Sequence, residues 1–270
     1  MIGEHAVHNG TIILTNEAVM PVTHRQLQSG FYVYESLRVI QAHPVHLDDH
    51  LQRLESSAKM INLSYPFSRE EIASWVHALI EVDLIERASL RIQVYGGKQP
   101  QLFITSAEIL SYPDSFYLEG VHAITYHGER FLPGAKTGNL LLNYLALEQA
   151  RGNGCFEALL VDGEGRVLEG TRSNFFAIKG GTLFTAADEK VLLGITRDRV
   201  LKAATQLGLK IVFEAPLQED VCAGYFDEVF ISATSMAAMP LSQVDGIVVG
   251  KLFANTREIC SLVRGWELED

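Results

Sequence analysis

The sequence predicts an α+β protein of two domains, and three features of the chain lead to this prediction. Strand-like and helix-like segments alternate through the first part of the chain, and residues 156–185 carry a run of strands at hairpin spacing. Between these parts lies a turn-rich stretch, SYPDSFYLEG at 111–120, which we interpret as the linker. We therefore expect an N-terminal domain over 1–115 and a C-terminal domain over 116–270.

The N-terminal domain is expected to combine strands with two amphipathic helices. From Leu47 onward, apolar residues recur at three- and four-residue steps, which predicts a helix. A second helix is expected over 68–82, because Ser68 followed by Glu71 is a capping-box pattern. The segments whose β-branched and aromatic residues predict strands are 10–15, 31–40, 88–97 and 101–110.

The C-terminal domain is expected to alternate strands, turns and helices. A strand is expected at 121–127, followed by a helix after Lys136. The hairpin-spaced run should form strand, Asp-Gly turn, strand, turn and strand. A helix is expected over 194–208 with Thr196 as its N-cap, and 227–240 predicts a strand that runs into a small-residue turn.

Composition excludes several classes of partner. The 270 residues carry a formal net charge of -11 with no block of lysine or arginine, so we expect neither nucleic acid nor a membrane surface as partner. Cys155, Cys222 and Cys260 are odd in number and far apart, which indicates a reducing compartment. With no basic leader and no long apolar stretch, the sequence predicts a cytoplasmic protein without a signal peptide.

The segment FLPGAKTGNLLLNYLALEQA contains one lysine, Lys136, with no acidic residue in the ten positions that follow it. A lysine in partly apolar surroundings loses ammonium solvation, so its pKa falls and the neutral amine becomes available as a nucleophile. An imine-forming lysine needs this property. A surface lysine at a helix start, with its stem along apolar residues, fits the same pattern and stays open as an alternative.

Two further segments have features of a cofactor site. In RVLEGTRSNFF, Glu169 ends a strand-like run, where a carboxylate can hold a proton on a ring nitrogen or simply face water. In LLGITRDRV, a glycine precedes Thr196 at a helix start, which suits a phosphate as well as a plain cap. ISATSMA adds hydroxyls at Thr234 and Ser235. A phosphate cradle, a ring-nitrogen partner and an imine-forming amine are together what pyridoxal 5'-phosphate requires.

Four motifs, KTGNLLLNYLA, LEGTRSNFF, LLGITR and HLDDHLQRL, occur in the order and spacing of the class IV aminotransferases. The chain resembles this fold-type IV pyridoxal-phosphate family over residues 5–265. The family includes branched-chain aminotransferases, D-amino-acid aminotransferases and aminodeoxychorismate lyases. The resemblance implies a small N-terminal α/β domain, a larger C-terminal domain with a β-barrel-like sheet, pyridoxal phosphate, and a homodimer in which a loop of the neighbouring subunit completes the active site.

The resemblance also assigns roles to individual residues. Lys136 resembles the imine-forming lysine of the family, and Glu169 resembles the partner of the pyridine nitrogen. Arg53 in HLQRL is similar to the phosphate-binding arginine. The other residues that the resemblance implies are Ile195, Thr196 and Thr234 for the phosphate, and Tyr34, Arg38, Arg91 and Ser235 for the substrate.

The substrate motifs are mixed. D-amino-acid enzymes grip the substrate carboxylate with an Arg-x-His pair, where this chain has Gly96 and no histidine nearby. Branched-chain enzymes carry arginines at the places of Arg38 and Arg91, although Ser89 and Ile92 replace other residues of that motif, and the lysine motif follows the D-amino-acid pattern. We expect amino transfer between an L-branched-chain or other aliphatic amino acid and a 2-keto acid. The alternatives are a D-amino-acid aminotransferase and an aminodeoxychorismate lyase that forms 4-aminobenzoate.

Two interpretations from other classes remain at this point. HPVHLDDH suggests a metal site in a hydrolase, but the leucines that continue into a helix favour a solvated turn, so we expect no metal. A catalytically inactive binding protein is the other alternative, and the presence of Lys136 and Glu169 argues against it. The residues that would form the metal site are His43, His46, Asp48, Asp49 and His50.

Overall fold

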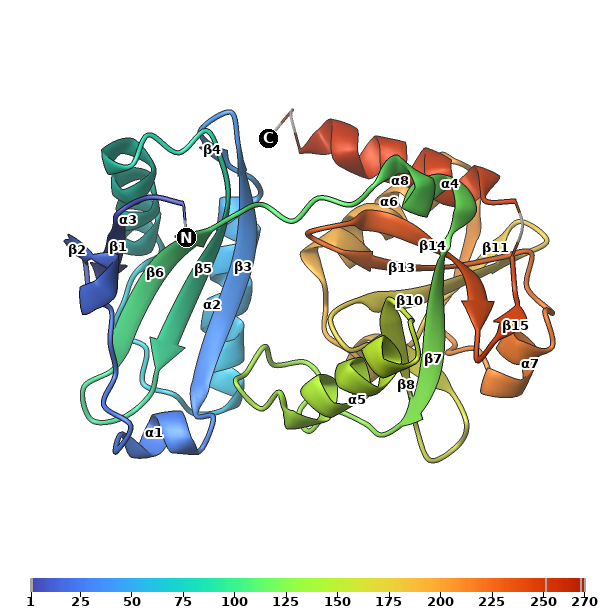
Figure 1. Cartoon of the computed structure of the whole chain (residues 1–270), viewed down its shortest axis with the longest axis horizontal. Coiled ribbons are helices and arrows are strands. Elements are labelled where there is room, and N and C mark those ends of the chain that lie inside the picture. Colours follow the sequence, from blue (N-terminus) through green and yellow to red (C-terminus); the bar gives the residue numbers. More distant parts are fainter. Residues whose placement is uncertain (1, 251, 268, 270) are drawn as a thin grey trace. The chain divides into compact units, whose positions relative to one another are not determined.

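A computed structural model gives the fold of the chain and describes residues 2–250, 252–267 and 269 (Figure 1). The chain divides into two compact units, an N-terminal and a C-terminal unit. The division into domains over 1–115 and 116–270 stays a prediction. The described residues of the N-terminal unit are 2–110, 135–140, 267 and 269, and those of the C-terminal unit are 111–134, 141–250 and 252–266.

The N-terminal unit is built on an antiparallel six-stranded sheet with the order β2-β1-β6-β5-β3-β4. Helices α2 and α3 pack on this sheet through one apolar cluster. The four predicted strands and two predicted helices are all present. The strands are β1 (His5–His8), β2 (Thr11–Leu14), β3 (Tyr32–Ile40), β4 (His43–Pro44), β5 (Arg87–Tyr95) and β6 (Gln101–Ala107), and the helices are α1 (Arg25–Gln28), α2 (Leu47–Met60) and α3 (Arg69–Val82), with a 3₁₀ turn at Thr15–Glu17.

Alternation along β3 decides which side chains reach the helices. Val33, Glu35 and Leu37 are buried, whereas Tyr34 is half-buried. Because successive side chains of a strand point to opposite faces, Glu35 shares a face with the apolar core and Tyr34 lies on the other face. A carboxylate on the core face needs polar partners, and helix α2 supplies them.

Helix α3 begins as the sequence predicts. The Ser68 Oγ accepts a hydrogen bond from the Glu71 N–H at 3.1 Å, and the Glu71 carboxylate accepts one from the Ser68 N–H at 2.8 Å. The capping box therefore satisfies two backbone donors at the start of the helix.

The C-terminal unit contains a closed six-stranded barrel, β10-β13-β14-β7-β8-β9, which the pairing of β9 with β10 completes. The register of that closing pair sets Glu169 opposite Asn174. Strands β11 and β12 extend the sheet from β10, and β15 pairs with β14. The strands are β7 (Val121–His127), β8 (Glu157–Val161), β9 (Val167–Gly170), β10 (Asn174–Lys179), β11 (Thr182–Phe184), β12 (Lys210–Val212), β13 (Glu228–Ala233), β14 (Ala237–Val244) and β15 (Ile247–Val248).

Helices cover the outside of this barrel. Cluster residues Phe175 and Ile231 fill the interior, whereas Phe176 and Phe230 point outward and pack with residues of α6 and α8. Strands β8, β10 and β13 are buried on both faces, which explains their nearly continuous apolar sequences. The helices are α4 (Asp114–Glu119), α5 (Leu141–Gly152), α6 (Ile195–Gln206), α7 (Gln218–Cys222) and α8 (Ala254–Trp266), with a 3₁₀ turn at Asp188–Lys190.

Two local expectations differ from the structure. The linker predicted at 111–120 contains helix α4, whose Phe116 packs on the barrel core, so tertiary burial overrides the turn-rich sequence. Helix α6 has Gly194 as its N-cap, which places Thr196 inside the first turn. No helix in the described ranges is long and apolar enough to cross a membrane.

Candidate functional site

Lys136 does not stand at a helix start, because helix α5 begins only at Leu141. It lies in a segment of the N-terminal unit that pairs with β3 through a bridge between Val33 and Thr137. The Lys136 N–H donates to the Ser57 Oγ at 3.0 Å, and the Lys136 carbonyl accepts from the Tyr34 N–H at 3.0 Å. The backbone of this lysine is thus bound on both sides.

The side chains of Lys136, Tyr34 and Arg91 meet. The Lys136 Nζ lies 4.7 Å from the centre of the Tyr34 ring, and the Arg91 guanidinium carbon lies 4.4 Å from it. An aromatic face attracts cations, so the ring holds both side chains beside it. The Arg91 Nε is buried without a hydrogen-bond partner among the residues that the structure describes. The three side chains lie close together, and their assignment to an active site stays a prediction.

Arg53 is held by a buried carboxylate on β3. Its Nε and Nη2 each donate to Glu35 at 2.7 Å, and the His50 Nδ1 lies 2.7 Å from the same carboxylate. Arg53 and His50 hold the pKa of Glu35 well below its usual range against the opposing effect of burial. Burial lowers the pKa of His50, so we assign a neutral imidazole that donates its Nδ1–H. The apolar periodicity from Leu47 onward predicts helix α2, but it does not indicate that Glu35 binds Arg53.

Arg38 is buried in an ion pair. Its Nη1 lies 2.7 Å from the Glu267 carboxylate, and the two side chains are only 10% and 9% exposed. Burial raises the pKa of Glu267, although Arg38 opposes this shift. Contact between Arg38 and a substrate carboxylate stays a prediction, and it would require Glu267 to share or release the guanidinium.

Glu169, at the end of β9, is a buried carboxylate of the C-terminal unit. One of its oxygens accepts from the Leu192 N–H at 3.2 Å, and the other lies 3.3 Å from the Arg130 Nη1. Its neighbour across the strand pair, Asn174, donates from its side chain to the Leu192 carbonyl at 2.9 Å. Two side chains thus bind the N–H and the carbonyl of one residue, Leu192. No pattern in the sequence indicates Arg130 or Leu192.

The chain after Leu192 leads into the first turn of α6, a helix of 12 residues. The first amides of a helix lack intrahelical acceptors, and the helix dipole favours an anion there. A Cβ on Gly194 would come within 2.3 Å of the Asn174 Oδ1, so close packing requires glycine at this place. Ile195 and Thr196 follow it directly. These features fit the phosphate site that the sequence predicts, with Thr196 in the first turn rather than at the cap.

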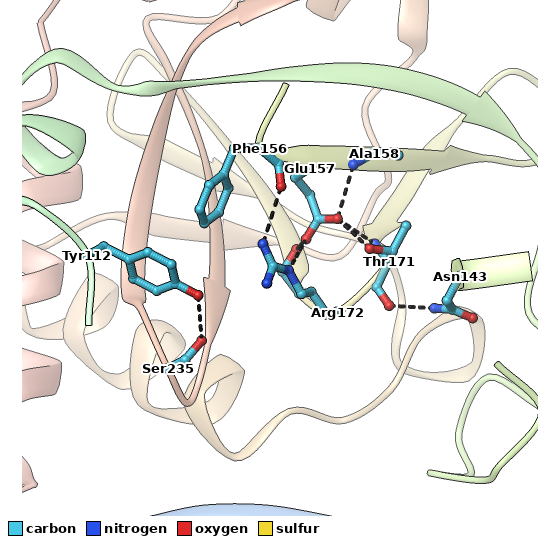
Figure 2. Close-up of polar contacts among 9 residues, drawn as sticks. Tyr112, Asn143, Phe156, Glu157, Ala158, Thr171, Arg172 and Ser235 are labelled. Atoms are coloured by element: carbon cyan, nitrogen blue, oxygen red, sulfur yellow. Dashed lines mark hydrogen bonds and ion pairs between the residues drawn. The ribbon is translucent and has the colours of Figure 1, made fainter. Parts of the chain in front are cut away.

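Thr234 and Ser235 lie in the tight turn between β13 and β14. The Ser235 carbonyl accepts from the Arg264 Nη2 at 2.9 Å, and the Ser235 Oγ lies 3.4 Å from the Tyr112 hydroxyl (Figure 2). Ala237 has a φ of 54°, a left-handed conformation that costs energy for a residue with a Cβ. Contacts from distant segments therefore fix the shape of this hydroxyl-bearing turn.

A second buried carboxylate, Glu157, organises the loop that follows Glu169 (Figure 2). It accepts from the Thr171 hydroxyl at 2.5 Å, from the Ser173 hydroxyl at 3.0 Å and from the Ala158 N–H at 3.0 Å. Arg172 lies 3.7 Å from the same carboxylate and donates to the Phe156 carbonyl at 3.2 Å. The loop between β9 and β10 is thereby pinned at three successive residues.

The histidine-rich segment 43–50 runs into the start of α2, which begins at Leu47. His50 is bound to Glu35, and within the described ranges no group of three or more His, Cys, Asp or Glu side chains converges on a point where a metal ion could bind. The hydrolase interpretation therefore has no geometric support.

Comparison with known proteins identifies the family. A model described as "Amino-transferase class IV" matches residues 32–244. The D-alanine aminotransferase of Bacillus licheniformis is 31% identical over 254 residues, which cover 90% of this chain and 89% of that protein. The branched-chain-amino-acid aminotransferase of Salmonella typhimurium is 30% identical over 266 residues, with coverages of 90% and 85%.

Comparison with a solved structure leads to the same family. The branched-chain amino acid aminotransferase of Escherichia coli superposes with a TM-score of 0.89 at 27% identity, covering 97% of this chain and 94% of that one. The barrel, the lysine segment and the extent of these matches define an aminotransferase fold. The chain belongs to the class IV aminotransferase family, and it is accordingly a pyridoxal-phosphate-dependent transaminase.

Proposed function

We propose that this transaminase moves an amino group between an aliphatic L-amino acid, above all a branched-chain one, and a 2-keto acid. The observation that carries the proposal is the way Lys136 is held. Its N–H and carbonyl are bound by Ser57 and Tyr34, and its Nζ lies 4.7 Å from the centre of the Tyr34 ring. A reactive amine on a fixed backbone returns to one place after each turnover, as repeated imine exchange requires.

Lys136 has two tasks in this proposal. Pyridoxal phosphate, when bound, supplies an aldehyde that condenses with amines and a pyridinium ring that withdraws electrons from the substrate Cα. The Lys136 amine would hold the cofactor through its aldehyde group. When a substrate amine occupies that group, the freed Lys136 amine would serve as the base for the proton at the substrate Cα.

The phosphate would be held by the start of α6 together with two side chains. The amides of Ile195 and Thr196 follow Gly194, where the backbone lies close to its neighbours. The first-turn amides and the helix dipole suit a doubly charged phosphate. Arg53 would add a guanidinium, which Glu35 orients through two 2.7 Å hydrogen bonds, and Thr234 would add a hydroxyl.

Glu169 would accept the ring N–H and keep the pyridine nitrogen protonated. Glu169 is 4% exposed, its carboxylate accepts from the Leu192 N–H, and the Arg130 guanidinium lies 3.3 Å from it. An ionised, water-poor carboxylate stabilises the positive ring on which the proton transfer at Cα depends. Because Leu192 lies three positions before Ile195, the first residue of α6, a short segment links the proposed ring partner to the proposed phosphate residues.

The substrate residues are proposed as Tyr34, Arg91, Arg38 and Ser235. Gly96 gives a structural reason against the carboxylate grip of D-amino-acid enzymes, because a Cβ there would lie 2.3 Å from the Phe31 ring. The neighbouring Arg91 offers a guanidinium beside the Tyr34 ring. Transfer from D-amino acids is the second candidate, which the 31% identity with a D-alanine aminotransferase favours. A homodimer is proposed from the family resemblance.

The test begins with purified protein mixed with pyridoxal phosphate. Borohydride reduction should leave a pyridoxyl group on the Lys136 peptide, and Lys136→Ala should lose both this label and all amino transfer. Lys59→Ala, an exposed lysine of α2, is the matched control and should keep both. A label on another lysine, or transfer that persists in Lys136→Ala, would contradict the assignment.

A donor panel decides the substrate. L-leucine, L-valine, L-isoleucine, D-alanine and D-glutamate are each paired with 2-oxoglutarate or pyruvate, and product chirality is measured. Transfer from the branched-chain L-amino acids supports the proposal, and transfer confined to D-amino acids replaces it with the second candidate. Conversion of aminodeoxychorismate to 4-aminobenzoate without any transfer would indicate the lyase.

A further inference from the structure

The Ser57 side chain contacts Lys136, the lysine on which the proposed chemistry depends. The contact is to the backbone of Lys136 and not to its side chain. The Ser57 side chain, on α2, is 1% exposed, and its Oγ accepts the Lys136 N–H at 3.0 Å. These residues are 79 positions apart, so only the tertiary fold creates the contact. The pairing of the lysine carbonyl with the Tyr34 N–H at 3.0 Å completes a two-point attachment.

Helix α2 carries both the Ser57 hydroxyl and the Arg53 guanidinium. Ser57 and Arg53 are one helical turn apart, so their side chains lie on the same face of the helix. On that face, Glu35 fixes Arg53 through two hydrogen bonds of 2.7 Å. A single rigid helix thus sets the position of the Lys136 peptide relative to a cation proposed to bind the phosphate.

We propose that Ser57 is a positioning residue for Lys136, an inference that rests on the proposed function. Its hydroxyl fixes the peptide of Lys136, so that the side chain leaves the backbone toward the Tyr34 ring. Alanine at position 57 would remove the acceptor and leave a polar N–H facing a buried methyl group. The lysine segment would then shift to find water or another acceptor, and the amine would approach the cofactor aldehyde in the correct orientation less often.

The experiment measures how fast Lys136 is labelled. Apoprotein is mixed with pyridoxal phosphate at a series of concentrations, samples are reduced with borohydride at timed intervals, and the labelled peptide is quantified by mass spectrometry. For Ser57→Ala we expect the rate at saturating cofactor to fall by about tenfold, the equivalent of one lost buried hydrogen bond. The concentration that gives half the maximal rate should change by less than about twofold, because the phosphate residues are intact.

Two matched controls isolate the contact. Ser56→Ala changes the exposed neighbour on the same helix, and Ser106→Ala removes a buried hydroxyl that donates to the Ile2 carbonyl. Both should label at the rate of the unchanged protein, and Ser57→Thr, which restores an oxygen, should recover much of the lost rate. Equal rates in Ser57→Ala and the unchanged protein, or an equal loss in Ser106→Ala, would overturn the inference. Failure of the unchanged protein to label at Lys136 would instead refute the proposed function.

Discussion

Glu35 in the N-terminal unit and Glu157 in the C-terminal unit are both 0% exposed, yet their partners differ in kind. Glu35 is neutralised by the Arg53 guanidinium and also binds His50. Glu157 is bound at hydrogen-bonding distance by two hydroxyls and two backbone amides, with Arg172 farther away at 3.7 Å. The first carboxylate therefore orients a cation, and the second shapes a loop. The same buried group serves different purposes because a guanidinium donates hydrogen bonds to it in one unit, whereas neutral hydroxyls and amides donate them in the other.

The two tryptophans allow each unit to be followed separately. Trp75 lies in α3 of the N-terminal unit and Trp266 ends α8 of the C-terminal unit. In a Trp266→Phe background, fluorescence reports the N-terminal unit, and in a Trp75→Phe background it reports the C-terminal unit. Urea unfolding in these two backgrounds measures the predictions on stability.

The largest effect is expected for Glu35→Ala. Removing one member of a buried ion pair leaves the Arg53 charge without compensation, which typically costs about 3–5 kcal/mol. Trp75 fluorescence should show that loss in the free energy of unfolding. Glu35→Gln, which keeps an acceptor but not the charge, should lose less. A loss below about 1 kcal/mol for the alanine variant would show that Arg53 readily finds water instead.

A smaller effect is expected for Glu157→Ala. Its hydrogen-bond donors are neutral, with the Arg172 guanidinium farther away at 3.7 Å, and each donor left unsatisfied costs about 1–3 kcal/mol. Trp266 fluorescence should report the change, and the loss should be smaller than for Glu35→Ala. If the two losses were equal, the contrast between charged and dipolar partners would not matter for stability.

Acidification should destabilise the N-terminal unit through the Glu35 cluster. Burial lowers the pKa of folded His50 below its usual 6.5, so the unfolded chain binds the proton first and stability falls as the pH drops below 6.5. Folded Glu35 likewise has a depressed pKa, and its contribution is lost progressively below 4.5. One proton gives a slope of at most about 1.4 kcal/mol per pH unit. Urea unfolding of His50→Gln between pH 7 and pH 5.5 should show a flatter dependence than the unchanged protein, and an unaltered slope would contradict the assignment of a neutral His50.

The smallest effect is expected at the cap of α3. Ser68→Ala removes the hydroxyl that accepts the Glu71 N–H and should cost about 1 kcal/mol, as reported by Trp75. Ser56→Ala, in the exposed middle of α2, is the control and should change stability by less than about 0.5 kcal/mol. If Ser68→Ala lost as much free energy of unfolding as Glu157→Ala, the helix cap would contribute as much to stability as the buried carboxylate.

Much of the fold was predictable because it is local. The capping box of Ser68 and Glu71, the periodicity from Leu47 and the strand composition at 31–40 each act over a few neighbouring residues. Helix α4 escaped prediction because its turn-rich sequence is overridden by burial of Phe116. Helix α8 was not predicted at all. The N-cap of α6 was placed two residues late because Gly194 needs no side-chain oxygen to begin the helix.

By itself, the sequence determined the motif around Lys136, the carboxylate at position 169 and the pattern that predicts helix α2. Only the tertiary structure decided that Glu35 holds Arg53, that Ser57 binds the Lys136 peptide and that Arg38 is paired with Glu267 across 229 positions. The physical reason is the separation along the chain between the interacting residues. Capping and periodicity depend on neighbours within a few residues, whereas the partner of a buried polar group depends on which distant segment is packed against it when water is excluded.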